Sequence, residues 1–246
     1  MDRMMYVAMS GAKQNMLAQA VNANNLANIS TTGFRSDYAA ARSMPLFGGS
    51  GHPTRVYSMA EKPGINFNPG SMNTTGRDLD IAIAGDGFLA VETPDENEAY
   101  TRAGNLNVDN AGVLRTGTGY AVIGDGGPVV VPEAAKIDIG KDGTVSIIAP
   151  GQATGSTIIA KLKLVNPDIK ELKRNEYGLF ELKNGEEAEF DNTVSVVSGT
   201  LETSNVNAAS ALVNMIELAR QFEMQIKMLK TAEKNNEQSS QLMRLG

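Results

Sequence analysis

Few residues of this 246-residue chain have the types and spacing that enzyme chemistry needs. The sequence has no cysteine, which excludes disulfides, thiolate zinc sites and cysteine nucleophiles. Its one histidine, His52, stands beside Pro53 in a segment rich in glycine and proline. A Ser-His-Asp triad would have to use that histidine, and a histidine-rich metal site is impossible. A solvated loop histidine is the simpler interpretation, and we expect no catalytic residue.

Two further patterns resemble ligand sites but lack a required part. Residues 117–122 (GTGYAV) begin like a dinucleotide fingerprint, but Val122 replaces the third glycine and no helix is readable after it. Pyrophosphate would have no helix N-terminus to bind, so a β-turn is the better interpretation. Asp80, Asp86 and Asp95 lack the regular ligand spacing and terminal glutamate of a calcium loop. We therefore expect no cofactor and no metal.

The charges are unevenly distributed and argue against a nucleic-acid partner. The formal net charge is −6. Residues 1–30 carry two basic and one acidic side chain, and residues 201–246 carry five of each. The intervening residues 31–200 hold 15 basic and 22 acidic side chains. Binding to phosphates needs clustered lysine and arginine, which an acidic body with near-neutral ends does not supply.

Neither a membrane span nor a secretory leader is readable. No segment approaches the roughly 18–20 consecutive apolar residues that cross a bilayer. The first residues, MDRMMYVAMSGAKQN, lack the unbroken apolar stretch of a signal peptide. We expect no membrane span. If the protein is exported, we expect the export to use no cleaved signal peptide.

Both ends of the chain show an apolar pattern with alternating steps of three and four residues. The mean period of 3.5 is that of a coiled-coil seam. The N-terminal series is Met5, Met9, Ala12, Met16, Gln19, Ala23 and Leu26. The C-terminal series is Leu212, Met215, Ala219, Phe222, Ile226 and Leu229. A single helix cannot bury the apolar side chains of such a narrow stripe, so the stripe needs a partner helix. We therefore predict that the two stripes form an assembly interface with partner helices. An ordinary amphipathic helix packed on its own domain is the alternative.

These patterns predict a first helix over about 3–28 and a second of about 40 residues that begins near Ser204, a reasonable N-cap. Asn28 is a candidate left-handed cap of the first helix. Prolines and glycines across 34–78 indicate extended and looped chain.

The middle of the chain has the pattern of short strands joined by turns. Asp142-Gly143 and Asn184-Gly185 each separate apolar residues in the way of a hairpin. Residues 109–112 form a longer turn, and residues 157–165 a further strand. Repeated short strands with this turn chemistry predict an antiparallel sandwich or open barrel over about 80–195.

The predicted fold class is a mainly β central domain, antiparallel and either sandwich or open barrel. Long α-helices at both termini form a coiled-coil-like layer. The predicted domains are a terminal helical domain of residues 1–30 with 201–246, an extended connector of residues 31–79, and a β-rich outer domain of residues 80–200.

Three blocks of the sequence resemble the signatures of one family, the bacterial flagellar rod and hook proteins. Residues 23–35 (ANNLANISTTGFR) resemble its N-terminal signature, and residues 198–223 its C-terminal signature. Residues 73–91 and 100–119 resemble its shared central segment. The short, acidic middle is most similar to the proximal-rod members. The matching motif residues are Asn25, Asn28, Thr32, Gly33, Phe34, Asn205, Asn207 and Glu223. For the asparagines, capping and hydrogen bonds between subunits are both open.

The resemblance implies a structural, non-enzymatic subunit of the proximal basal-body rod, the drive shaft that transmits torque. It implies that both terminal helices pair in an inner coiled-coil layer with the β domain outside. The implied partners are further copies of itself, neighbouring rod subunits and the flagellar export apparatus, and the implied place is the periplasmic rod. A distal-rod or hook subunit is the alternative, followed by a β-rich binding module with helical oligomerisation tails.

Overall fold

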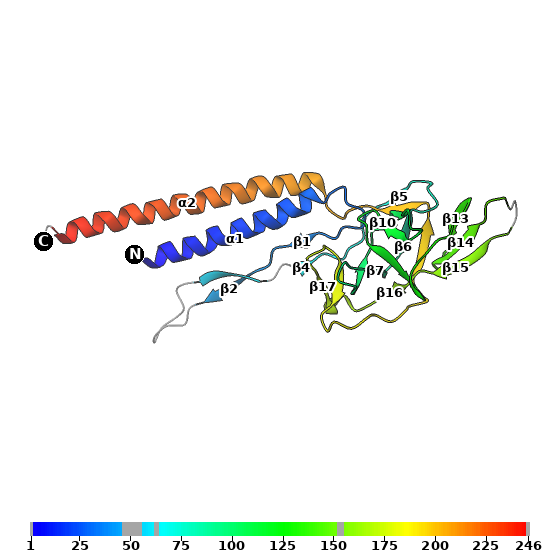
Figure 1. Cartoon of the computed structure of the whole chain (residues 1–246). Helices are drawn as coiled ribbons and strands as arrows, with labels where there is room; N and C mark the ends of the chain where they lie inside the picture. Colours follow the sequence, from blue (N-terminus) through cyan, green and yellow to red (C-terminus); the bar gives the residue numbers. More distant parts are fainter. Residues whose placement is uncertain (1, 46–55, 62–63, 152–154, 245–246) are drawn as a thin grey trace. The chain divides into compact units, whose positions relative to one another are not determined.

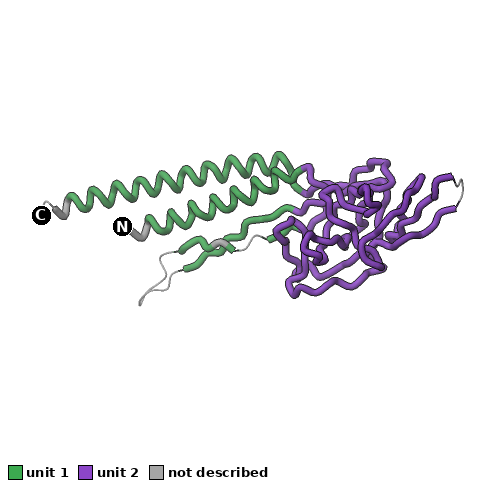
Figure 2. The backbone as a smooth tube through the Cα atoms, viewed as in Figure 1, with its two compact units in different colours: residues 1–29, 36–66, 206–246 green, residues 30–35, 67–205 purple. Residues whose placement is uncertain are grey.

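A computed structural model describes most of the chain as two compact units (Figures 1 and 2). The described residues are 2–45, 56–61, 64–151 and 155–244. The first unit, here called the helical unit, contains residues 1–29, 36–66 and 206–246. The second, called the β unit, contains residues 30–35 and 67–205. His52 lies outside the described residues.

The fold is mainly β with one helix near each end of the chain, as predicted, and its sheets are antiparallel. Helix α1 spans Asp2–Ala27 and helix α2 spans Ala208–Arg244, and the two pack side by side (Figure 1). They run antiparallel, because Asn22 Nδ2 near the end of α1 donates to the carbonyl of Ala211 at 2.7 Å. The 26 and 37 residues of the helices correspond to roughly 39 and 56 Å, so α2 continues past the start of α1. In the described part of both helices, no stretch is long and apolar enough for a bilayer crossing.

Two predicted helix caps differ from the structure. Helix α2 is capped by Asn207, not Ser204: the Asn207 Oδ1 accepts a hydrogen bond from the Ser210 N–H at 3.0 Å. Asn207 lies directly before the first helical residue, so it can reach the free N–H groups of the first turn. At the end of α1, Asn28 is not left-handed, since Glu96 is the one described non-glycine residue with positive φ. Asn28 instead donates its N–H and its Nδ2 to the carbonyl of Asn24, at 3.2 and 3.0 Å.

Four short strands complete the helical unit. Strand β1 (Asp37–Tyr38) pairs with β4 (Gly64–Ile65), and β2 (Ala41–Pro45) pairs with β3 (Val56–Ala60). Strand β3 packs on α1. The segment predicted as a connector, 31–79, is thereby divided between the two units.

The β unit is built on one sheet of nine antiparallel strands. Its members are β7 (Phe88–Glu92), β8 (Glu98–Thr101), β9 (Leu106–Val108), β10 (Leu114–Thr116), β11 (Ala121–Gly124), β12 (Gly127–Pro128), β16 (Leu164–Val165), β17 (Leu172–Arg174) and β18 (Phe180–Leu182). The order is β17-β18-β8-β7-β11-β10-β9, with β12 beside β11 and β16 beside β7. A short 3₁₀ turn, Ile169–Glu171, precedes β17.

Smaller sheets surround this one. Strands β13 (Lys136–Ile139), β14 (Thr144–Ile148) and β15 (Thr157–Lys161) form a three-stranded sheet. Strand β6 (Ile81–Ala84) pairs with β19 (Ser195–Ser198), and β5 (Met72–Thr74) pairs with β20 (Thr200–Glu202). One buried apolar core joins the main sheet to the three-stranded sheet and to the β6–β19 pair, and includes Ile81, Leu89, Val91, Leu106, Leu114, Val122, Val145, Leu162 and Leu164.

Some of the predicted turns and strands of the β unit are confirmed and others are wrong. The Asp142-Gly143 hairpin is confirmed between β13 and β14, and the 109–112 turn joins β9 to β10. Residues 117–120 join β10 to β11, so the glycine pair there belongs to a β-turn. The Asn184-Gly185 hairpin is wrong, because β18 pairs with β17 and β8 and residues 183–194 contain no strand. The strand predicted over 157–165 is two strands, since β15 stays in the small sheet and β16 enters the main one.

Candidate assembly interface

The two long helices bury small side chains and expose large ones. Their fully buried apolar residues in the described range are four alanines, Ala8, Ala12, Ala211 and Ala232. Their exposed large apolar residues are Tyr6, Met9, Met16, Leu17, Leu212, Val213, Ile216, Met224 and Met228. Hydrophobic stabilisation grows with the apolar area removed from water, so an alanine contact contributes little. The apolar surface that could stabilise these helices most therefore faces outwards in the single chain.

The predicted interface residues fall into three groups by exposure. Ala12 is buried. The half-buried members are Met5, Leu26, Met215, Ala219, Phe222, Ile226 and Leu229. The exposed members are Met9, Met16, Ala23 and Leu212. Only part of the predicted seam is thus covered within the single chain. Contacts of the seam with other subunits stay a prediction.

The motif asparagines make hydrogen bonds within the chain. Asn25 is 9% exposed, and its Nδ2 donates to the Asp37 carbonyl at 2.6 Å while its Oδ1 accepts from the Asp37 N–H at 2.8 Å. One side chain thereby attaches strand β1 to helix α1. In the β unit, Asn205 Nδ2 donates to the carbonyl of Asn68 at 2.9 Å. Of the other motif residues, Thr32 is half-buried and Glu223 is exposed.

Glu202 is the centre of a buried charge cluster in the β unit. Its Oε1 accepts from Arg35 Nη1 at 2.6 Å and from the Gly70 N–H at 2.8 Å. Its Oε2 accepts from Arg102 Nη1 at 2.8 Å. The three charged side chains are at most 4% exposed. Buried ions need such partners, because removing one of them leaves an uncompensated charge in a low-dielectric interior.

The cluster holds two guanidiniums against one carboxylate. Backbone carbonyls supply the further acceptors for Arg102, whose Nε donates to Gly87 O at 2.9 Å and whose Nη2 donates to Gly85 O. The Phe88 ring lies 5.6 Å from the Arg102 guanidinium carbon, at cation–π distance. Burial lowers the pKa of the Arg35 guanidinium, and the hydrogen bond from Arg35 to the carboxylate opposes that change.

Gly33, one of the motif residues, packs directly on this cluster, and the motif residue Phe34 contacts the nearby Arg174. The Gly33 N–H donates to the Glu202 carbonyl at 2.8 Å. Gly33 has φ of +67°, and a Cβ there would lie 2.3 Å from the Arg102 carbonyl carbon, so only glycine fits. The Phe34 ring lies 5.0 Å from the guanidinium carbon of Arg174. The motif therefore fixes backbone geometry in the β unit.

Sequence reasoning missed the three charged residues of the cluster. A signal for them was present, since each lies in a different one of the blocks with family resemblance. Arg35 ends the N-terminal block, Arg102 lies in the central block and Glu202 lies in the C-terminal block. Arg35 and Glu202 also stand next to points where the chain passes between the units, at 35/36 and 205/206. Within the β unit, the cluster thus holds together the segment that ends at Arg35 and the segment around Glu202 that leads to α2.

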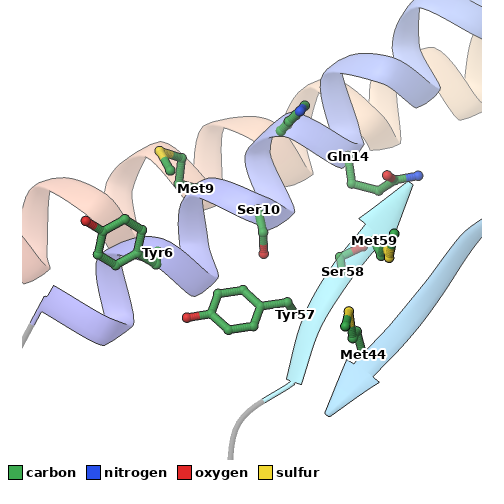
Figure 3. Close-up of a pocket in the computed structure, with 9 residues that line it drawn as sticks. Tyr6, Met9, Ser10, Gln14, Met44, Tyr57, Ser58 and Met59 are labelled. Atoms are coloured by element: carbon green, nitrogen blue, oxygen red, sulfur yellow. The ribbon is translucent and has the colours of Figure 1, made fainter. Parts of the chain in front are cut away.

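A groove of about 540 Å³ lies between α1 and the β2–β3 hairpin of the helical unit (Figure 3). We call it the α1–β3 groove. Its apolar lining consists of Tyr6, Met9, Met44, Tyr57 and Met59, and Lys13 is the one charged side chain among the described residues that line it. Figure 3 shows Tyr57 pointing from β3 toward α1, and Gln14 reaching from α1 toward β3. The groove offers a polarizable, adaptable apolar surface rather than a set of reactive groups. Among the described residues no three histidine, aspartate or glutamate side chains gather as metal ligands.

Family models match three parts of the chain. Residues 5–35 match the model described as "Flagella basal body rod protein". Residues 82–147 match "Flagellar hook protein FlgE/F/G D1 domain", and residues 197–242 match "Flagellar basal body rod FlgEFG protein C-terminal". The first and last matches contain most of the two long helices, and the central match lies in the β unit.

Curated relatives match over nearly the whole chain. The sequence is 44% identical to the flagellar basal-body rod protein FlgF of Escherichia coli strain K12, over 99% of both chains. It is 41% identical to FlgF of Salmonella typhimurium strain LT2, again over 99% of both. Identity to the flagellar basal-body rod protein FlgG of Bacillus subtilis strain 168 is 34%, over 95% of this chain and 96% of that one.

Proposed function

The chain belongs to the family of flagellar basal-body rod proteins, as a FlgF-like structural subunit and not an enzyme, and from this premise we propose how it assembles. Its two terminal helices pack with those of neighbouring rod subunits into a coiled-coil-like layer. This layer forms part of the proximal rod, and the assembled rod transmits torque.

One observation carries this proposal: the fully buried apolar residues of the described helices are alanines, while their large apolar side chains are exposed or half-buried. Burying a large apolar side chain stabilises by roughly 1.5–3 kcal/mol. Ordering the backbone of one residue costs about 1–2 kcal/mol. A helix pair that leaves its large side chains in water is thus weakly held by itself. Lateral packing against other helices supplies the missing burial.

The proposed organisation follows the predicted domains. These are an inner helical domain of residues 1–30 with 201–246, a connector of residues 31–79 and an outer β-rich domain of residues 80–200. The compact units amend these bounds, since residues 36–66 group with the helices and residues 201–205 with the β unit. The antiparallel sheets around one core support a sandwich arrangement of the outer domain. Because α2 continues past the start of α1, its final turns are available to a neighbouring subunit along the axis. The family resemblance adds the flagellar export apparatus as a partner and the periplasm as the location of the rod.

Charged substitutions on the half-buried seam test the proposal. We expect Leu26→Asp and Ile226→Asp each to abolish incorporation into basal bodies and motility, because a carboxylate in an apolar contact costs several kcal/mol. The β unit should unfold at an unchanged denaturant concentration. Ile158→Asp is the matched control, since Ile158 is 69% exposed on β15. Normal incorporation of both seam variants would mean that the helices do not form the interface.

A further inference from the structure

The chain passes between its two units at four points, and the segments next to all four points meet in the β unit at Glu202. The crossings lie at 29/30, 35/36, 66/67 and 205/206. We call residues 30–35 the first connecting segment, residues 67–71 the second and residues 202–205 the third. Tension that passes along the chain from the helical unit enters the β unit through these three segments.

Glu202 joins the three connecting segments to one another and to the main sheet. Its backbone carbonyl accepts from the Gly33 N–H at 2.8 Å, and its Oε1 accepts from Arg35 Nη1 at 2.6 Å. These two bonds fasten the first segment. The same Oε1 accepts from the Gly70 N–H in the second segment at 2.8 Å. Its Oε2 accepts from Arg102, which directly follows strand β8 of the main sheet.

Neutral hydrogen bonds outside the charge cluster connect the same segments. Asn205 in the third segment donates its N–H to the Phe34 carbonyl at 3.3 Å and its Nδ2 to the Asn68 carbonyl at 2.9 Å. The Thr203 N–H donates to the Ser71 carbonyl at 2.8 Å. Bonds between ionised groups are stronger than such neutral ones, so the bonds made by the Glu202 carboxylate are the strongest of the set.

We propose that Glu202 is a mechanical clamp, which carries tension directly from the first connecting segment to the third and keeps it off the rest of the β unit. Arg35 and Glu202 are 167 positions apart in the chain. While their bond holds, tension applied outside the crossings at 29/30 and 205/206 passes across the clamp, and the intervening residues carry little of it. This role deepens the proposed rod function and rests on it, because a rod that transmits torque loads its subunits.

Constant-force measurements on the purified full chain test the clamp, and the absence of cysteine allows handles at chosen positions. In the first geometry, DNA handles are attached at Ala27→Cys and Ala209→Cys, which are exposed positions just outside the crossings at 29/30 and 205/206. In the second geometry, they are attached at Asn110→Cys and Ile158→Cys, which are exposed positions of the β unit outside the three segments. The lifetime before rupture reports the unfolding rate under force.

Arg35→Met removes the charged bond to the first segment, while Glu202 keeps its pair with Arg102. In the first geometry we expect the lifetime before the first rupture to fall at least about tenfold, because a charge-assisted hydrogen bond under load is lost. In the second geometry it should fall by less than half as much on a logarithmic scale. The matched control is Lys173→Met, which breaks a partly exposed pair with Glu181 and should leave both lifetimes nearly unchanged.

Two outcomes would overturn the clamp: an unchanged lifetime of Arg35→Met in the first geometry, or an equal fall in both geometries, which is a general loss of stability. If Arg35→Met lacks the near-ultraviolet signal of the folded β unit, Arg35→Lys takes its place under the same criteria, since it keeps the charge and loses the guanidinium fork. The measurement uses single purified chains and does not depend on assembly. Absence of the unsubstituted chain from basal bodies would instead refute the rod function.

Discussion

The β unit and the helical unit of this chain bury different kinds of residue. In the β unit, Tyr100, Leu106 and Val91 are at most 1% exposed, and even three charged side chains are buried with partners. In the helical unit the buried apolar residues are alanines, while large side chains such as Met16 stay in water. The β unit therefore contains its own stabilising contacts. The described part of the helical unit leaves much of its large apolar surface without such contacts.

Amide exchange tests this comparison with the largest expected effect. In dilute, monomeric full-length protein we expect residues 5–26 and 206–243 to exchange with little protection, because their large apolar side chains are exposed or only half-buried. Amides of β7 and β8 should exchange at least about 10³-fold more slowly, which corresponds to ~4 kcal/mol or more. Slow exchange throughout both helices of a verified monomer would contradict the comparison.

Replacing the buried carboxylate has the next largest effect. Glu202→Gln keeps the side-chain shape but leaves Arg35 and Arg102 without a counter-ion, so we expect the unfolding free energy of the β unit to fall by about 3–5 kcal/mol. Urea unfolding followed by the near-ultraviolet signal of the tyrosines measures it.

The matched control is Glu181→Gln, whose pair with Lys173 at 2.9 Å is partly exposed. Such a surface pair contributes about 0–1 kcal/mol. Equal losses in the two variants would show that the buried cluster contributes no more than a surface pair.

Comparing Gly33→Ala with Gly76→Ala separates the cost of backbone strain from the cost of a steric clash in the β unit. Gly33 combines φ of +67° with a Cβ position 2.3 Å from the Arg102 backbone, so we expect a loss of about 2–3 kcal/mol. Gly76 has a similar φ of +73° but open space around it. Gly76→Ala should then lose only the cost of the left-handed backbone, about 1–2 kcal/mol. The same urea experiment should rank them in this order, and the reverse ranking would remove the argument for close packing at Gly33.

Acid should weaken the β unit by the smallest amount. A hydrogen bond from Arg115 lowers the pKa of Asp109, and one from the Thr144 hydroxyl lowers the pKa of Asp142, below the ordinary 3.8. A carboxyl group with a lowered folded-state pKa stabilises above its unfolded pKa, and this stabilisation is lost as the pH falls through the folded value. The thermal midpoint of the β unit should therefore decline below about pH 4. Asp142→Asn should make that decline shallower, and an identical acid profile would contradict the assignment.

Elements decided by neighbouring residues were predictable from the sequence. Asp142-Gly143 accepts the positive φ that a tight hairpin needs, and Gly143 has φ of +80°. The 3.5-residue apolar period likewise predicted both terminal helices. The turn at Asn184-Gly185 exists too, since the Gly185 N–H donates to Leu182 O at 3.1 Å. Its predicted hairpin does not, because a turn fixes local direction while strand pairing depends on distant partners.

The sequence by itself determined which segments are helical, which turns are tight, and that the helices present more apolar surface than one helix can bury. Only the tertiary structure decided that alanines take the helix–helix contact and that Arg35 meets Glu202, 167 positions along the chain. Turn and helix rules depend on residues within about one turn of each other. Burial of a charge depends on whichever distant segments supply its donors, and the folded chain brings those together.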